Sequence, residues 1–194
     1  MALTQLREWL LAPYFENSGE NGCKKSSHAS HLSNVTCPLH RRMLVISGND
    51  DFCEAAIRSV QAFVDEVSSI SVVNFAGDTL KGKNRKQVLG SECDIATLDC
   101  RDSFKPGDVM AVAGIVKRSG CLILICPALS EWVNNISVSF LSEGFTLTQS
   151  RYLERFIKHL RNSDYVALHT EEKTTLPDTA MYRISQGVTS NVYR

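Results

Sequence analysis

Residues 41–51 read RRMLVISGNDD, from Arg41 to Asp51. Four apolar residues run without a break, and a Ser-Gly turn and two acidic residues come after them. An unbroken Val/Ile/Leu run is typical of a strand covered on both faces, as in a parallel sheet. A short turn into a capped helix is how a βαβ unit begins. The segment therefore predicts an α/β fold, with any ligand site at the C-terminal ends of the strands.

The bulk composition fits a single globular domain with a full-sized core. The chain has 194 residues, a formal net charge of zero and 43% hydrophobic residues. Neutral charge argues against a nucleic-acid footprint over the whole chain but leaves room for a local basic patch. No apolar run reaches the ~18 residues that a membrane span needs, so we expect no membrane partner. Seven cysteines, an odd number, favour buried thiols in a reducing cytoplasm over a disulfide framework.

Hydrophobic periodicity divides the chain into four parts. Residues 1–15 predict a short amphipathic helix that ends near Pro13, and 16–40 predict a polar loop or insertion. Residues 41–170 predict the α/β domain, and 171–194 a polar tail. The expected strands are Met43–Ser47, Ile70–Phe75, Asp94–Asp99, Cys121–Cys126 and Tyr165–His169. The expected helices cover 51–67, 85–89, 106–118 and 150–162.

This alternation predicts a three-layer, doubly wound (Rossmann-like) and mostly parallel five-stranded sheet, preceded by the N-terminal helix. We expect the strand order 3-2-1-4-5, counted along the chain, with a crevice between the first and fourth strands. The candidate residues of that crevice are polar or small and follow strand ends: Ser47, Gly48, Asn49, Asp99 and Arg101.

Residues 77–84, GDTLKGKN, match the phosphate-loop pattern G-x-x-x-x-G-K and follow a strand. Asn84 is a poor substitute for the Ser/Thr that holds Mg²⁺, and the loop follows the second strand instead of the first. Asp99 ends an apolar strand as a magnesium-binding acid would, but Asp is common there. We therefore favour an exposed basic loop over an ATP site. Its cations would be solvated or touch phosphate: Lys81, Lys83, Arg85 and Lys86.

A group of cysteines and histidines lies between residues 23 and 40. Thiolates and imidazoles in so short a segment could hold zinc tetrahedrally. Their spacing fits no standard finger, and few apolar residues surround them, so incidental residues of a polar loop are the favoured interpretation. The metal-ligand candidates are Cys23, His28, His31, Cys37 and His40.

Other catalytic signatures are incomplete. The turn at 47–51 has one glycine where dinucleotide binders use three, and its two aspartates would repel a pyrophosphate. Cys53 and Cys126 are possible nucleophiles, but no histidine is placed near them by sequence, so we expect both to be buried. His169 is a candidate only because it ends the fifth expected strand, and Trp132 is expected to plug the sheet edge. We therefore assign no catalytic residue.

A second group of cations lies on the polar side of the expected helix 150–162, whose apolar side faces the core. Such cations either contact RNA phosphate, in a salt-dependent and sequence-independent way, or form an ordinary solvated face. Both interpretations stay open, here and for the cations of residues 81–86. The second group consists of Arg151, Arg155, Lys158 and Arg161.

Four blocks of the chain, in this order and with similar gaps, resemble the N-terminal domain of the bacterial tRNA(Met) cytidine acetyltransferases, the TmcA family. They are RRMLVISGNDDFC, KQVLGSECDIATLDCRDSF, LILICPALSEW and SRYLERFIKHLRNSDYVALH, and they cover about Arg41 to His169. The resemblance implies a longer enzyme that fuses this domain to an ATP-driven helicase-like module and a GNAT acetyltransferase. Such an enzyme transfers acetyl from acetyl-CoA to N4 of the wobble cytidine, giving N4-acetylcytidine.

The resemblance implies that this chain is a non-catalytic accessory domain with no cofactor of its own. ATP, Mg²⁺ and acetyl-CoA would belong to the full-length enzyme, which would modify tRNA in the cytoplasm. The implied partners are the helicase-like module, approached through residues 171–194, the acetyltransferase module and tRNA(Met). The alternative is a free-standing nucleotide- or small-molecule-binding α/β domain, with its site at the C-terminal ends of the strands.

Overall fold

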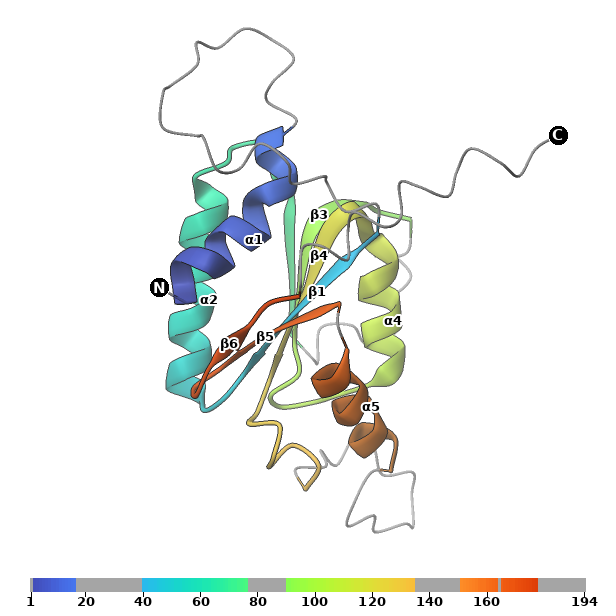
Figure 1. Cartoon of the computed structure of the whole chain (residues 1–194). Coiled ribbons are helices and arrows are strands. Elements are labelled where there is room, and N and C mark those ends of the chain that lie inside the picture. Colours follow the sequence, from blue (N-terminus) through green and yellow to red (C-terminus); the bar gives the residue numbers. More distant parts are fainter. Residues whose placement is uncertain (1, 17–39, 77–89, 135–150, 164, 178–194) are drawn as a thin grey trace, which may run out of the picture.

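The computed structural model describes residues 2–16, 40–76, 90–134, 151–163 and 165–177. Figure 1 shows three layers, with a twisted sheet between two pairs of helices. Helices α1 (Ala2–Glu16) and α2 (Asp50–Asp65) cover one face, and α4 (Pro106–Ile115) and α5 (Arg151–Asn162) cover the other. The strands are β1 (Arg42–Ser47), β2 (Val72–Ala76), β3 (Cys93–Asp99), β4 (Val116–Cys126), β5 (Val166–Thr170) and β6 (Thr174–Thr175).

The sheet order is β2-β3-β4-β1-β5-β6. Strands β1 to β5 are parallel, and β6 pairs with β5 in the antiparallel direction. The predicted doubly wound, mostly parallel fold is therefore confirmed, and β6 adds a pairing in the segment expected to be a tail. The predicted order 3-2-1-4-5 is wrong, because β4 lies between β3 and β1. The apolar strands β1 and β4 occupy the middle, whereas the half-exposed β2 lies at an edge.

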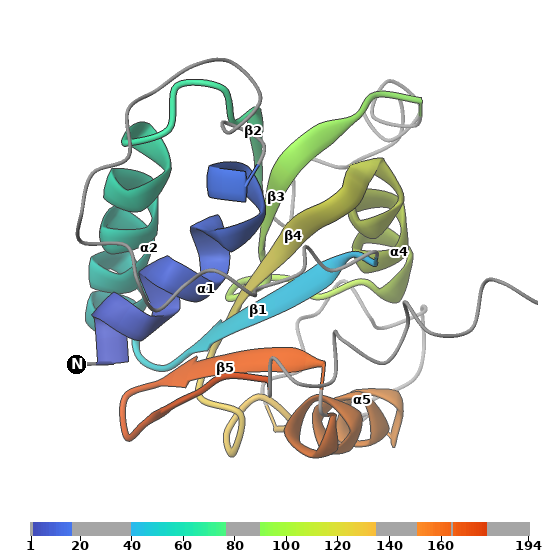
Figure 2. The same cartoon turned by 45° about the horizontal axis from the view of Figure 1, so that its top comes forward.

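The core lies on both faces of the central strands. Leu44 and Ile46 of β1 pack with residues of α1 and α2, whereas Val45 packs with residues of α4 and α5. Figure 2 shows these two pairs of helices on opposite sides of the sheet. This alternation is why the strand must be apolar without a break. Trp132 is also buried, edge-on to Phe104 with ring centroids 5.0 Å apart.

The helix that begins at Pro106 is shorter than predicted. Helix α4 ends at Ile115, so Lys117 lies in β4 instead of in a last helical turn. Val116 already pairs with Cys93 of β3, and Lys117 Nζ lies 3.3 Å from the Asp94 carboxylate. At Gly120 a Cβ would lie 2.4 Å from the Asp94 carbonyl oxygen, so only glycine allows this approach of the two strands. The expected helix at 85–89 lies outside the described residues.

Helix α1 continues through Pro13, although we predicted that it would end there. Proline has no N–H, so the Trp9 carbonyl loses its usual partner within the helix. Arg42, only 3% exposed, supplies the replacement: Nη1 donates to Trp9 O, and Nη2 donates to Leu10 O at 2.9 Å. Its guanidinium also lies over the Trp9 ring at 4.8 Å, and Nε donates to Ser119 O. One buried cation thus connects α1, β1 and the start of β4.

Replacing Arg42 by methionine should lower the free energy of unfolding by about 2–4 kcal/mol, since two buried helix carbonyls lose a charged donor. Urea denaturation of the 194-residue chain measures the loss. The control Arg118→Met, at an exposed position, should change it by less than about 0.5 kcal/mol. An Arg42→Met chain as stable as the control would contradict this role.

Candidate functional site

The turn after β1 is filled by the chain's own polar groups. Ser47 Oγ donates to Pro127 O at 2.9 Å and accepts from Leu129 N at 3.0 Å. These bonds join the ends of β1 and β4, which are neighbours as predicted. The Ser47 hydroxyl is therefore committed to holding the two strand ends together.

The N-terminus of α2 carries an internal anion. Asn49 Oδ1 caps the helix by accepting from Phe52 N at 2.8 Å, and Asn49 N donates to Glu171 Oε1 at 2.6 Å. A Cβ on Gly48 would lie 2.7 Å from that same oxygen, so the carboxylate covers the turn. Helix N-termini favour anions, and in nucleotide-binding α/β domains a phosphate lies here. In this chain Glu171 takes that position.

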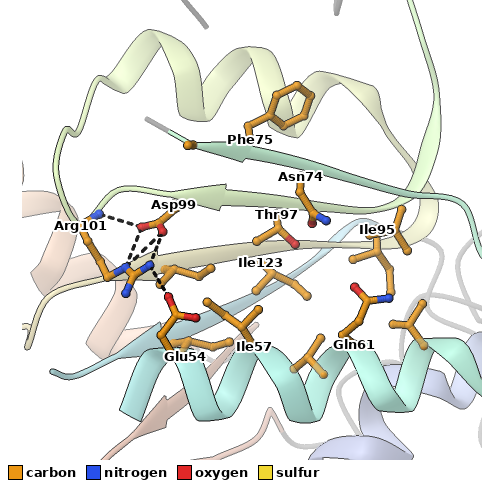
Figure 3. A pocket seen from close by; sticks show the side chains of 16 residues that line it. Glu54, Ile57, Gln61, Asn74, Phe75, Ile95, Thr97, Asp99, Arg101 and Ile123 are labelled. Carbon is orange, nitrogen blue, oxygen red and sulfur yellow. Dashed lines mark hydrogen bonds and ion pairs between the residues drawn. The ribbon is translucent and has the colours of Figure 1, made fainter. Parts of the chain in front are cut away.

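Asp99 and Arg101 form the centre of an ion cluster at the end of β3 (Figure 3). Arg101 Nη2 lies 2.7 Å from Asp99 Oδ2 and 2.9 Å from Glu54 Oε1, and Nη1 lies 3.2 Å from Asp50 Oδ1. Hydrogen bonding to Asp99 is the main cause that raises the pKa of Arg101, so the guanidinium stays charged. One cation faces three carboxylates, which leaves a net charge of −2. The cluster connects Asp99 and Arg101 to α2, next to the turn at Ser47–Asn49.

A cavity of about 480 Å³ extends from this cluster between α2 and the strands β1, β2, β3 and β4. Its floor is apolar, and in Figure 3 the side chains of Asn74, Thr97 and Gln61 point into it. Asn74 and Thr97 make no side-chain hydrogen bond within the described ranges. The lining residues are Ile46, Glu54, Ile57, Val60, Gln61, Val64, Val72, Asn74, Phe75, Ala76, Ile95, Thr97, Asp99, Arg101, Ile123 and Ile125.

The two candidate nucleophiles are core residues. Cys53 and Cys126 are fully buried, and burial is the main cause that raises the pKa of each thiol. Both therefore remain protonated at neutral pH and lie out of reach of solvent. His169 is 7% exposed, its Nδ1 lies 2.7 Å from Thr174 Oγ1, and burial lowers its pKa, so a neutral ring is favoured.

Several candidates fall outside the described residues: Cys23, His28, His31, Cys37, Lys81, Lys83, Arg85 and Lys86. His40 is described and lies edge-on to Tyr165, with ring centroids 5.8 Å apart. Within the described ranges, no three His, Cys, Asp or Glu side chains are arranged to hold a metal ion. Nor is any helix there long and apolar enough to cross a membrane.

The second cation group forms one exposed face of α5. Leu153, Ile157 and Leu160 are buried, which turns the opposite side outward. Arg151, Arg155 and Lys158 are exposed at i, i+4 and i+7, so they share one face of the helix, and Arg161 follows a turn later. None of the four forms an ion pair within the part of the chain that the structure describes.

Helices α2 and α5, on opposite faces of the sheet, carry opposite charge. Helix α5 has four cations and one carboxylate, a net charge of +3. Helix α2, across the sheet, has four carboxylates and one cation, a net charge of −3. The neutral composition therefore conceals a basic face and an acidic face.

Sequence reasoning missed the residues that complete these sites. Glu171 was assigned to a polar tail, and nothing in its neighbourhood indicates that it reaches α2, 122 positions away. Glu54 and Asn74 were not identified as cavity residues either. The signal for Glu54 was available, since it lies one helical turn after Asp50 and shares its face.

The fold and these sites define a Rossmann-like α/β domain whose strand ends are held by internal polar contacts. A sequence model of the family described as tRNA(Met) cytidine acetyltransferase TmcA, N-terminal, matches residues 26–170. The chain belongs to this family, and the predicted resemblance is confirmed. Helix α1 lies outside the matched segment.

Two curated relatives bear the name tRNA(Met) cytidine acetyltransferase TmcA. The protein from Haloferax volcanii is 26% identical over 158 residues, which cover 76% of this chain and 21% of the relative. The protein from Nitrosococcus halophilus is 24% identical over 172 residues, which cover 82% of this chain and 23% of the relative. The chain thus spans less than a quarter of the length of either relative.

Proposed function

We propose that this chain is a non-catalytic accessory domain of a tRNA(Met) cytidine acetyltransferase, and that α5 contacts the tRNA backbone. The observation that carries the proposal is the exposed, unpaired cation face of α5 in a member of this family. Arginine and lysine side chains on such a face neutralise phosphates and release counterions. The domain would pack on the helicase-like module and leave acetyl transfer to the rest of the enzyme.

ATP, Mg²⁺ and acetyl-CoA are proposed to bind other modules of the full-length protein. The strand ends of this domain suit a nucleotide poorly, because Glu171 already occupies the N-terminus of α2. The net charge of −2 beside Asp99 would also repel phosphates. A cytoplasmic location is supported by five free, buried cysteines among the described residues.

The triple substitution Arg151→Glu, Arg155→Glu and Lys158→Glu should weaken binding of a tRNA(Met) transcript by the 194-residue chain. Fluorescence anisotropy at several salt concentrations gives the slope of log affinity against log salt. The slope should fall in magnitude by about 3, roughly one for each lost phosphate contact.

The matched control is Arg58→Glu, Arg118→Glu and Lys173→Glu, three exposed cations of other elements. It changes the net charge by the same amount but leaves α5 intact, so its salt slope should stay near that of the wild type. Equal losses in the two triple variants would show a net-charge effect only and would contradict a contact through α5.

As a second candidate we propose that the cavity beneath α2 binds a small organic cation with an apolar body. Its volume, apolar floor and unpaired polar side chains suit a small ligand, and the net charge of −2 at its mouth selects against anions. Tryptamine and indole-3-propionate carry the same ring and opposite charges. Tryptamine should raise the unfolding temperature of the chain, whereas indole-3-propionate and Mg-ATP should not.

Asp99→Asn, which removes one carboxylate of the mouth, should reduce the shift caused by tryptamine. Glu172→Gln is the control with the same change of charge, since Glu172 is exposed in the turn between β5 and β6 and does not line the cavity. Equal shifts with the cationic and the anionic indole would contradict the charge selection.

A further inference from the structure

We infer that Tyr152, in the first turn of α5, is a stacking platform for an unpaired RNA base, with Arg151 and Arg155 beside it on the flanking phosphates. The inference deepens the proposed function and rests on it, since that function places RNA along α5. Backbone contact alone distinguishes no RNA structure, whereas a stacking platform selects single-stranded nucleotides.

The ring of Tyr152 is held in place by two other aromatic rings. It stacks on Phe156 at 13° and on Phe104 at 29°, with centroids 6.2 Å apart in both pairs. Phe104 is 5% exposed and packs edge-on against the buried Trp132, so the group is anchored in the core. A ring that is already fixed loses little conformational entropy when a base stacks on it.

The same ring remains open to solvent. Tyr152 is 48% exposed, and it is the one exposed large hydrophobic side chain on α5. Its hydroxyl makes no hydrogen bond within the described ranges. Burial of the remaining aromatic surface is therefore available to a ligand, and a base has a flat face of suitable size.

The charges around Tyr152 select nucleic acid over a protein partner. Arg151 precedes it, and Arg155 lies three residues on, on the adjoining strip of the helix. A protein-docking centre needs several exposed, contiguous apolar groups, but Tyr152 is the one exposed large apolar side chain on α5, and unpaired cations lie beside it. Aromatic rings between cations are the arrangement by which proteins bind single strands. Bases in a duplex are already stacked, so the platform takes only unpaired ones.

The test compares fluorescently labelled rU12 with a 12-base-pair RNA duplex, both titrated with the 194-residue chain. Tyr152→Ala should weaken rU12 binding about 5-fold to 100-fold and leave duplex binding unchanged, because stacking is lost and phosphate contact is kept. The salt slope for rU12 should not change. Tyr152→Phe, which keeps the ring, should bind as the wild type does.

Tyr152→Leu keeps apolar packing but removes the flat ring, so it should bind rU12 as weakly as Tyr152→Ala. If the triple charge reversal on α5 weakens both RNAs while Tyr152→Ala weakens neither, stacking is wrong and the backbone contact stands. If Tyr152→Ala weakens both RNAs equally, its effect is structural, and the platform is again wrong. If none of these variants changes binding, the proposed RNA contact fails as well.

Discussion

Strands β1 and β4 pair in the middle of the sheet, and both must be covered on both faces. Leu44 and Ile46 face one layer and Val45 the other, so neither layer of helices can be dispensed with. Helix α5 contributes Leu153, Ile157 and Leu160 to this cover. Its remaining face has to point to solvent, and that face carries the cations. The basic surface is thus a consequence of how the central strands are buried.

The edge strand β2 is less buried than the central strands. Helix α1 fills the space on one side of α2, tied down by the buried Arg42. The cavity lies between α2 and the four strands β1 to β4. Its mouth is acidic, whereas α5 across the sheet is basic. A polyanion is therefore attracted to one face of the domain and repelled from the other.

The sequence predicted the local features well and the long-range ones poorly. The block at residues 41–51 identified the strand, the turn and the helix, because apolar runs and caps act over a few residues. The strand order was predicted wrongly, since it depends on which strands are buried in the middle of the sheet, and that is decided by contacts between distant segments. The end of α1 was predicted wrongly at Pro13, because the donor that replaces the missing proline N–H, Arg42, lies far along the chain. The contact between Glu171 and the N-terminus of α2 was missed because it too joins residues far apart in the sequence.

For the candidate site too, the local features were predictable from the sequence and the long-range ones were not. The helical spacing of the α5 cations predicted a shared face, but only the structure shows that neighbouring carboxylates leave them unpaired. The cavity forms only when four strands and a helix come together, so no single stretch of sequence could indicate it.

The proposed contact between RNA and α5 can be observed residue by residue. The most direct measurement is a titration of the isotope-labelled 194-residue chain with a tRNA(Met) transcript, following each backbone amide by NMR. If α5 contacts the RNA, the largest signal changes fall within residues 151–162 and around Phe104, with α2 unaffected. Changes centred on α2 and the cavity strands, with α5 unaffected, would contradict it.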